Sequence, residues 1–335
     1  MSELRWNPLL AEWVATATHR QERTFLPPTD FCPLCPTKKG GFPTEVPEGT
    51  YDIVVFENQF PSLRPDPLPP AVESTDLYPV RPSEGVCEVV LYSPNHTTTL
   101  ADEPVEQIYK LVQVWTDRFI ELGALDHVSY VFEFENKGEA TGVTLHHPHG
   151  QIYGYPFIPP GIARELAQSR HHRARTGRCL ICDILAEERL DGRRIVAENN
   201  SFVATIPFFA RWPYEVHIYS SRHFQALSDM SSSEQQDVAA MLKMVLAAFD
   251  RLFDLSFPYM MVIHQRPVDG GVYDYYHFHI EFYPPLRTAT KLKYLAGSEM
   301  GAGMFINDTL AEEKTSELRA RIKPAVWAQR EEDRD

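Results

Sequence analysis

Long apolar runs, basic residues and cysteines are all scarce in this chain of 335 residues. No apolar stretch reaches the roughly 18 residues that a membrane-spanning helix requires, and the first residues contain no apolar signal core. The net charge of −14 at pH 7 disfavours broad binding of nucleic acid. We therefore expect a cytoplasmic protein with no membrane or nucleic-acid partner.

The composition is that of a folded protein long enough for two domains of ordinary size. Apolar residues make up 43% of the chain and aromatic residues 12%, which supports a packed core and argues against disorder. Because the chain as a whole is acidic, the site of an anionic ligand must be made positive locally by a few side chains, backbone N–H groups or a metal ion.

Of the five cysteines, four form two Cys-x-x-Cys pairs, Cys32 with Cys35 and Cys179 with Cys182. Cys87 is left over. In a cytoplasmic chain such pairs bind zinc more often than they form disulfides. The sequence therefore favours two metal-binding positions, one in each half.

The most informative stretch covers residues 142 to 153 and includes His146, His147, His149 and Gln151. An apolar, β-prone run follows, so we predict a strand in which His147, His149 and Gln151 share one face. A neutral imidazole is a good nucleophile near pH 7. An amide can donate to a phosphoryl oxygen but cannot deliver a proton. The pattern favours a phospho-histidine intermediate, and a metal site or a polar surface turn is the alternative.

The second half of the chain repeats the order of the first. Each half contains a Cys-x-x-Cys pair, a strand followed by a histidine (His96 or His223), an amphipathic helix and two further strands. We predict helices over 105–122 and 232–252, a surface loop over 61–85, and strands over 6–17, 51–56, 87–92, 127–135, 259–264 and 277–283. This order indicates a tandem duplication of one α+β unit, with domains 1–168 and 169–335.

The His-x-His-x-Gln sequence at 147–151 resembles the active-site motif of the galactose-1-phosphate uridylyltransferase branch of the histidine-triad superfamily. The similarity extends to residues 7–9, 134–138, 277–287 and 293–300. It implies an α+β fold of two tandem histidine-triad-like units, each an antiparallel sheet with packed helices. It also implies ping-pong chemistry, in which His149 takes a uridylyl group from UDP-glucose and galactose 1-phosphate then accepts it.

The resemblance assigns roles to further residues. Gln151 would stabilise charge on the transferring phosphoryl group, and Arg20 and Arg23 would lie near the nucleotide phosphates. The other positions that match substrate contacts of the family are Asn58, Asn136, Thr144, Lys293, Ala296, Ser298 and Glu299. The last four match a hexose-phosphate segment that a partner subunit completes, which implies a homodimer. Many members have Tyr at the position of Ser298 and Gln at that of Phe305, so the sugar range stays open.

Spacing alone, without the resemblance, favours a plainer interpretation of the charged residues. The two arginines Arg20 and Arg23 would be solvated surface charges. Lys293 and Glu299 would be surface charges as well.

Metal ligands also follow from the resemblance. Cys32, Cys35, His96 and His147 match a zinc site, and this set suits structural, tetrahedral zinc. The duplication predicts a second zinc at Cys179, Cys182, His223 and His277. Some members instead place iron in this half, at positions that match Glu165, His264, His277 and His279. Because both sets use His277, we expect only one to be filled, and the two thiolates favour zinc.

Two other functions stay open beside a UDP-glucose–hexose-1-phosphate uridylyltransferase. One is a related ADP-sugar phosphorylase, in which phosphate accepts the nucleotidyl group. The motif of that relative usually has Ser in place of Gly150, which favours uridylyl transfer here. The other is a nucleotide-sugar binding protein with a dead site, against which the intact His149 and Gln151 argue.

Overall fold

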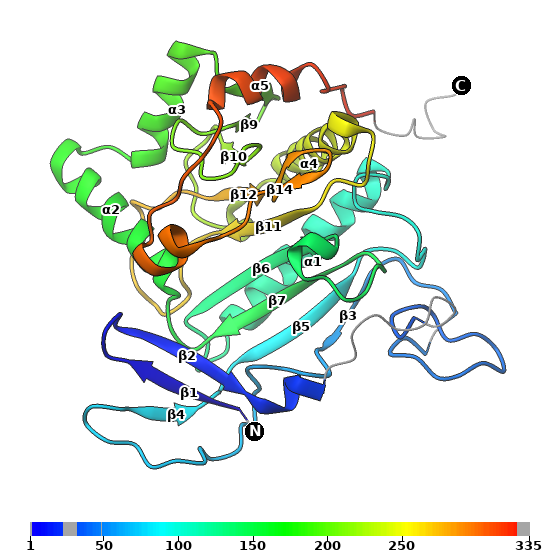
Figure 1. The fold of residues 1–335 in the computed structure, drawn as a ribbon, viewed down its shortest axis with the longest axis vertical. Helices are drawn as coiled ribbons and strands as arrows, with labels where there is room; N and C mark the ends of the chain where they lie inside the picture. Colours follow the sequence, from blue (N-terminus) through cyan, green and yellow to red (C-terminus); the bar gives the residue numbers. More distant parts are fainter. Residues whose placement is uncertain (1, 23–31, 48, 327–335) are drawn as a thin grey trace.

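The computed structural model describes residues 2–22, 32–47 and 49–326. Its centre is an antiparallel sheet of nine strands in the order β3-β5-β7-β6-β11-β12-β10-β9-β8 (Figure 1). The first half supplies β3 (Val54–Glu57), β5 (Val86–Leu91), β6 (Tyr130–Lys137) and β7 (His149–Tyr155). The second half supplies β8 (Ile195–Glu198), β9 (Phe202–Thr205), β10 (Val216–Ser220), β11 (Tyr259–His264) and β12 (His279–Tyr283).

The strand order confirms the tandem duplication. The series β3-β5-β7-β6 is mirrored by β9-β10-β12-β11, and the two halves meet where β6 pairs with β11, with Asn136 opposite Met260. The two units therefore share one continuous sheet. This pairing satisfies the backbone groups of both central strands, which would otherwise be exposed sheet edges.

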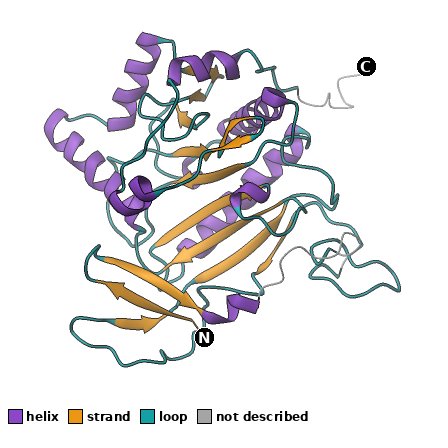
Figure 2. Ribbon diagram, in the orientation of Figure 1, coloured by secondary structure: helices purple, strands orange, loops and turns teal. Residues whose placement is uncertain are grey.

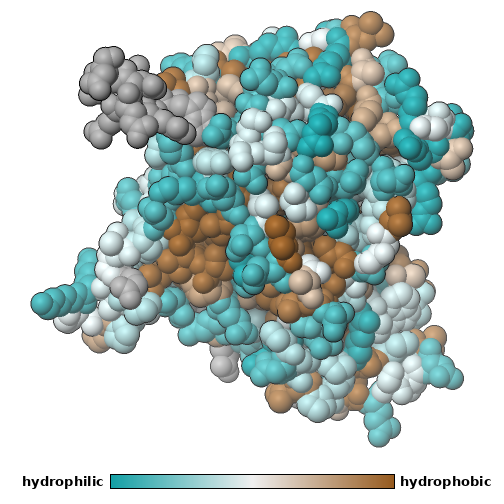
Figure 3. Space-filling view, turned by 180° about the vertical axis from the view of Figure 1, so that it is seen from behind, coloured by the Kyte–Doolittle hydropathy of each residue, from teal (hydrophilic) through white to brown (hydrophobic). Residues whose placement is uncertain are grey.

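Two long helices, α1 (Val105–Gly123) and α4 (Ser232–Phe253), pack together over one face of the sheet (Figures 1 and 2). Both follow from the apolar periodicity of the sequence. The predicted capping box of α4 is present, since the Ser231 side chain accepts from the Glu234 N–H and the Glu234 carboxylate accepts from the Ser231 N–H. The view from behind shows a mixed hydrophilic surface with apolar patches near the middle (Figure 3).

The other face carries α2 (Pro160–Thr176), α3 (Leu180–Asp191) and a small sheet with strand order β2-β1-β4. The sequence prediction was wrong in two places here. The single strand expected over 6–17 is a hairpin of β1 (Ser2–Asn7) and β2 (Glu12–Ala17). The expected loop over 61–85 contains β4 (Val80–Pro82), which pairs with β1.

Shorter elements complete the chain. They are the helical turns η1 (Thr18–Glu22), η2 (Glu139–Thr141), η3 (Leu227–Asp229) and η4 (Ser298–Ala302), the strands β13 (Leu286–Thr288) and β14 (Lys291–Leu292), and helix α5 (Ala311–Arg319). Within the described ranges, no helix has the length and apolarity needed to cross a membrane.

Side-chain alternation along β7 separates the core from the candidate site. Gly150 and Ile152 are buried, whereas His149, Gln151 and Tyr153 are only partly buried and lie on the opposite face. Ile152 packs with α1 and α4 in the main apolar core. The sheet is thus anchored on one face by the helices and presents polar side chains on the other.

Candidate active site and metal centres

The imidazole of His149 is held in one orientation by the backbone. Its Nδ1 lies 2.7 Å from the carbonyl oxygen of His147, so Nδ1–H donates and the lone pair remains on Nε2. A cavity of about 410 Å³ adjoins His149 and is also lined by Asn136, Lys137 and Gly138. This geometry offers an oriented imidazole beside a space that a ligand can enter.

Gln151, two residues further along β7, has a defined amide orientation as well. Asn58 Nδ2 and the Tyr153 hydroxyl both donate to Gln151 Oε1, each over 3.3 Å. Oε1 is therefore the acceptor end, and Nε2 is the donor end that can meet a phosphoryl oxygen. The structure thus brings His149, Gln151 and Asn58 together.

The other residues predicted to contact the nucleotide lie in two places. Arg20 is in η1, where its Nη1 donates to the Phe60 carbonyl oxygen over 3.3 Å, close to the loop that holds Asn58. Arg23 lies outside the described residues. Thr144 is buried in the loop that leads to β7, between the cavity-lining residues Val143 and Leu145.

The residues of the predicted hexose-phosphate segment form an ion pair and hydrogen bonds with one another and with nearby residues of the same loop. Lys293 Nζ lies 3.2 Å from Glu299 Oε1, and both side chains are buried. The expectation that these two are surface charges is therefore wrong. The Ala296 N–H donates to Glu299 Oε2 over 3.2 Å, and Ser298 Oγ donates to the Met304 carbonyl oxygen over 2.7 Å. None of the four lines the described cavity beside His149.

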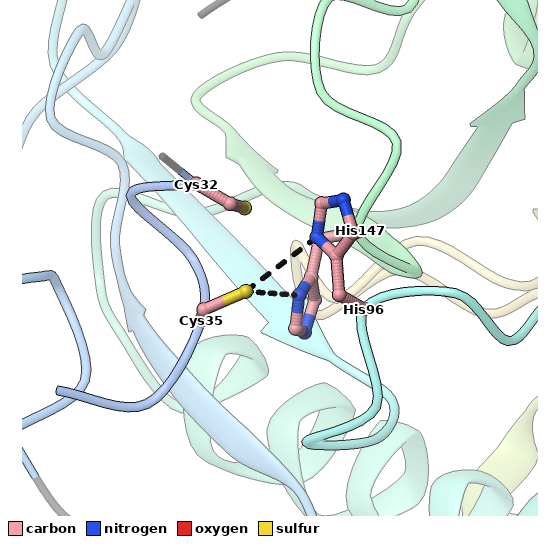
Figure 4. A group of neighbouring side chains, drawn as sticks. All are labelled: Cys32, Cys35, His96 and His147. Atoms are coloured by element: carbon pink, nitrogen blue, oxygen red, sulfur yellow. Dashed lines mark hydrogen bonds between the residues drawn. The ribbon is translucent and has the colours of Figure 1, made fainter. Parts of the chain in front are cut away.

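The first Cys–His group comprises Cys32, Cys35, His96 and His147 (Figure 4). Cys35 Sγ lies 3.5 Å from His96 Nδ1 and 3.6 Å from His147 Nδ1. With metal bonds of about 2.3 Å to sulfur and about 2.0 Å to nitrogen, a tetrahedral ion requires sulfur–nitrogen separations of about 3.5 Å. The four side chains therefore fit one tetrahedral metal ion.

Neighbouring groups prepare His147 to act as a ligand. Its Nε2–H donates to the Ser93 carbonyl oxygen over 2.9 Å, which directs the Nδ1 lone pair to the thiols. Burial lowers the pKa of His147 to about 4 and therefore keeps the ring neutral. Burial and the adjacent Cys32 thiol raise the pKa of Cys35 to about 11, so a positive ion is needed to hold this thiol as thiolate.

The second Cys–His group, Cys179, Cys182, His223 and His277, has the same geometry. Nδ1 of His277 lies 3.5 Å from each sulfur and 3.3 Å from Nδ1 of His223. The last value matches the nitrogen–nitrogen edge of about 3.3 Å in a tetrahedral site. The Cys182 thiol, with the rings of His223 and His277, lowers the pKa of Cys179, and the Cys179 thiolate then raises the pKa of Cys182.

A third group shows that the predicted competition for His277 was wrong. Glu165, His264, His279 and Glu281 converge separately, and His277 belongs to the thiol group instead. His264 Nδ1 lies 3.0 Å from Glu165 Oε2, and His279 Nε2 lies 3.4 Å from Glu281 Oε1. Burial alone lowers the pKa of His264, but the two carboxylates outweigh it and raise the pKa to about 9. The described residues thus form three separate groups that could hold a metal ion.

Three tyrosines near the site were missed in the sequence. The Tyr51 hydroxyl donates to the Ser93 carbonyl oxygen over 2.7 Å and contacts His147. The Tyr92 hydroxyl occupies the space beside Gly150 where a Cβ would lie. Tyr51 and Tyr92 belong to no motif. Tyr153 could have been predicted to lie near the site, because it follows Gln151 by two residues and strand alternation puts both on one face.

The chain matches known proteins over nearly its whole length. Residues 1–159 match the family profile described as the N-terminal domain of galactose-1-phosphate uridyl transferase, and residues 165–330 match the C-terminal domain. Galactose-1-phosphate uridylyltransferase of Thermotoga maritima is 44% identical over 320 residues, which cover 95% of this chain and 98% of that protein.

Solved structures point to the same family. A structure described as a uridylyltransferase matches with a TM-score of 0.84 at 35% identity, covering 95% of this chain and 98% of the other. An ADP-glucose phosphorylase from Arabidopsis thaliana has a TM-score of 0.71 at 23% identity, with coverage of 95% and 98%, and so shares the fold. On these matches over nearly its whole length, the chain belongs to the galactose-1-phosphate uridylyltransferase family.

Proposed function

We propose that this chain is a UDP-glucose–hexose-1-phosphate uridylyltransferase that acts through a uridylyl group on His149. The observation that carries the proposal is the hydrogen bond from His149 Nδ1 to the His147 carbonyl oxygen. It leaves Nε2 as the nucleophile, next to a cavity and on the same strand face as an amide donor. Membership of the family supplies the class of substrates.

The reaction then has two displacements at the α-phosphorus of UDP-glucose. In the first, His149 Nε2 forms a bond to phosphorus while the bond to the glucose 1-phosphate oxygen breaks. In the second, a phosphate oxygen of galactose 1-phosphate attacks, the N–P bond breaks and His149 returns to its neutral form. The leaving groups are stable phosphates, so the site needs no strong acid. Gln151 Nε2 donates to the non-bridging oxygens as their charge changes.

The remaining predicted contacts keep the roles that the family pattern suggests. Arg20 and Arg23 would bind the nucleotide phosphates through their forked donors, and Asn58 would approach the uridine. Asn136 and Thr144 would border the phosphoryl group. The Lys293–Glu299 pair would shape the loop that carries Ala296 and Ser298, and this loop would serve the hexose site of a second copy in a homodimer.

Zinc is the metal we propose for both Cys–His groups, because two thiolates and two imidazoles suit it and leave no open position. In the first group it would hold His147, and through it the backbone that orients His149. The third group has two imidazoles and two carboxylates, a set that suits iron or another ion that accepts oxygen ligands. We assign the first Cys–His group to a domain of residues 1–168 and the other two to residues 169–335, except that Glu165 precedes this boundary.

An assay of two substrate pairs tests the proposal against its closest rival. The purified protein is given UDP-glucose with galactose 1-phosphate, or ADP-glucose with inorganic phosphate, and the released sugar phosphates and nucleotides are measured. We expect turnover of the first pair to exceed that of the second by orders of magnitude. Preference for the second pair would identify an ADP-sugar phosphorylase, and no turnover of either would favour a binding protein.

A further inference from the structure

We propose that Tyr153 is a positioning residue for the transfer, whose hydroxyl holds the amide of Gln151 with Nε2 toward the reacting phosphoryl group. The inference rests on the proposed function, because the orientation of Gln151 matters only if a phosphoryl group reacts at His149. Tyr153 lies on the same face of β7 as both residues.

Two donors fix the orientation of the Gln151 amide. The Tyr153 hydroxyl and Asn58 Nδ2 each donate to Oε1 over 3.3 Å. Asn58 is itself fixed, since its Oδ1 accepts from the Phe60 N–H over 2.9 Å and its N–H donates to the Cys87 carbonyl oxygen over 2.8 Å. A flipped Gln151 amide would place its NH₂ group against both donors, which costs the hydrogen bonds and leaves them unpaired.

The tyrosine ring is placed by packing and its hydroxyl by polar neighbours. The ring contacts Phe134 edge to face, with centroids 5.0 Å apart and planes at 82°. Burial, followed by the Cys87 thiol, raises the pKa of Tyr153, whereas Arg20 and Ser62 at the same hydroxyl lower it. The hydroxyl therefore stays protonated near pH 7 and donates. It links Arg20, the predicted phosphate ligand, to the amide that would stabilise the transition state.

The expected effect of this hydroxyl is on rate rather than on substrate binding. Without it, Gln151 Oε1 loses one of the two donors that the described residues supply, and the amide samples other orientations. A net hydrogen bond contributes about 0.5–1.5 kcal/mol, so the Tyr153→Phe substitution should slow both transfer steps about two- to twelvefold. Because the phenyl ring remains, the packing against Phe134 is kept.

The test compares four variants with the wild type: Tyr153→Phe, Gln151→Ala, the double variant Gln151→Ala/Tyr153→Phe, and Tyr155→Phe as a matched control. Tyr155 lies on the same strand face and packs against Tyr153 and Phe157. Rapid quenching and intact-protein mass spectrometry follow the uptake of the uridylyl group from UDP-glucose and its discharge by galactose 1-phosphate. Melting temperatures show whether each variant is folded.

We expect Tyr153→Phe to lower both rate constants with little change in KM, Tyr155→Phe to behave as the wild type, and Tyr153→Phe to add no loss in the Gln151→Ala background. Additive losses, equal losses in both tyrosine variants, or a rise in KM alone would overturn the role of Tyr153. A normal Tyr153→Phe enzyme beside a labelled wild type would reject this inference alone. An unlabelled wild type would reject the proposed function, and the inference with it.

Discussion

His149 Nδ1 donates to the backbone carbonyl of His147 over 2.7 Å, and the imidazole of His147 belongs to the first Cys–His group. The second half repeats the arrangement, with His279 Nδ1 2.9 Å from the His277 carbonyl oxygen. There, however, Glu281 stands at the position of Gln151, and its Oε1 lies 3.4 Å from His279 Nε2. A carboxylate at that point repels a phosphoryl group, so among the described residues the arrangement of His149 with Gln151 suits phosphoryl transfer better than that of His279 with Glu281.

The first prediction concerns His147 as a metal ligand. With the proposed zinc in the first group, His147→Ala should lose this ion and melt at a lower temperature, because three remaining ligands would hold zinc poorly and the loop before β7 would lose its support. His146→Ala is the matched control, since the His146 side chain is 60% exposed and pairs only loosely with Glu139 over 3.6 Å. Metal analysis and thermal unfolding measure both effects. Unchanged metal content in His147→Ala would contradict this role.

A second prediction tests whether the second Cys–His group and the third group bind metal independently. Cys182→Ala should lose one zinc per chain, because Cys182 Sγ contacts both His223 and His277. Glu281→Gln should leave the zinc content unchanged, since Glu281 belongs only to the third group. Native mass spectrometry and elemental analysis give the counts. If Glu281→Gln also lost a zinc, the two groups would not be independent.

Sequence patterns predicted the elements that depend on local periodicity. The apolar stripes of α1 and α4 and the cap at Ser231 were predictable for this reason. The members of both Cys–His groups lie far apart in the sequence, and the family resemblance and the internal repeat predicted them.

Features that depend on contacts between separate segments of the chain could not be predicted from the sequence. The strand β4 has three residues and exists because β1 lies beside it. The two units share one continuous sheet only because β6 of the first unit pairs with β11 of the second. His277 and His279 look like one pair in the sequence. In the structure the ring of His277 belongs to the second Cys–His group, whereas the ring of His279 belongs to the third group. The burial of Lys293 and Glu299 depends on their pairing, which spacing does not reveal.

A third prediction concerns pH and the buried carboxyl of Glu133. Burial raises the pKa of Glu133 to about 8. Since the unfolded value is about 4.3, the folded state retains a proton that the unfolded state has lost, and stability falls as pH rises between these values. Glu133→Gln removes this dependence and keeps an acceptor for Gln265 Nε2, which now donates to Glu133 Oε2 over 2.7 Å.

We therefore expect the Glu133→Gln variant to be more stable than the wild type by about 2 kcal/mol or more at pH 8, and equal to it near pH 4. Thermal unfolding across this range measures the difference. The control is Glu121→Gln, because the Glu121 side chain is 64% exposed and should show no such trend. A constant offset between Glu133→Gln and the wild type at all pH values would contradict the titration of Glu133.

A fourth prediction concerns the contact between Gly150 and Tyr92. A Cβ at position 150 would overlap the Tyr92 hydroxyl oxygen and crowd the Phe134 carbonyl. Gly150→Ala should cost about 1–3 kcal/mol of stability by overpacking and displace the backbone beside His149. Adding Tyr92→Phe should recover part of the loss. Gly161→Ala, at a position where an added Cβ would meet only open space, is the control. A fully stable Gly150→Ala variant would show that the strand can shift freely.

The most direct test of the central claim is intact-protein and peptide mass spectrometry after mixing with UDP-glucose. We predict one uridylyl group per chain on His149 of the wild type, none on a folded His149→Ala variant that retains its metal, and loss of the label when galactose 1-phosphate is added. A label on another residue, or turnover of both substrates by His149→Ala at the wild-type rate, would contradict the account.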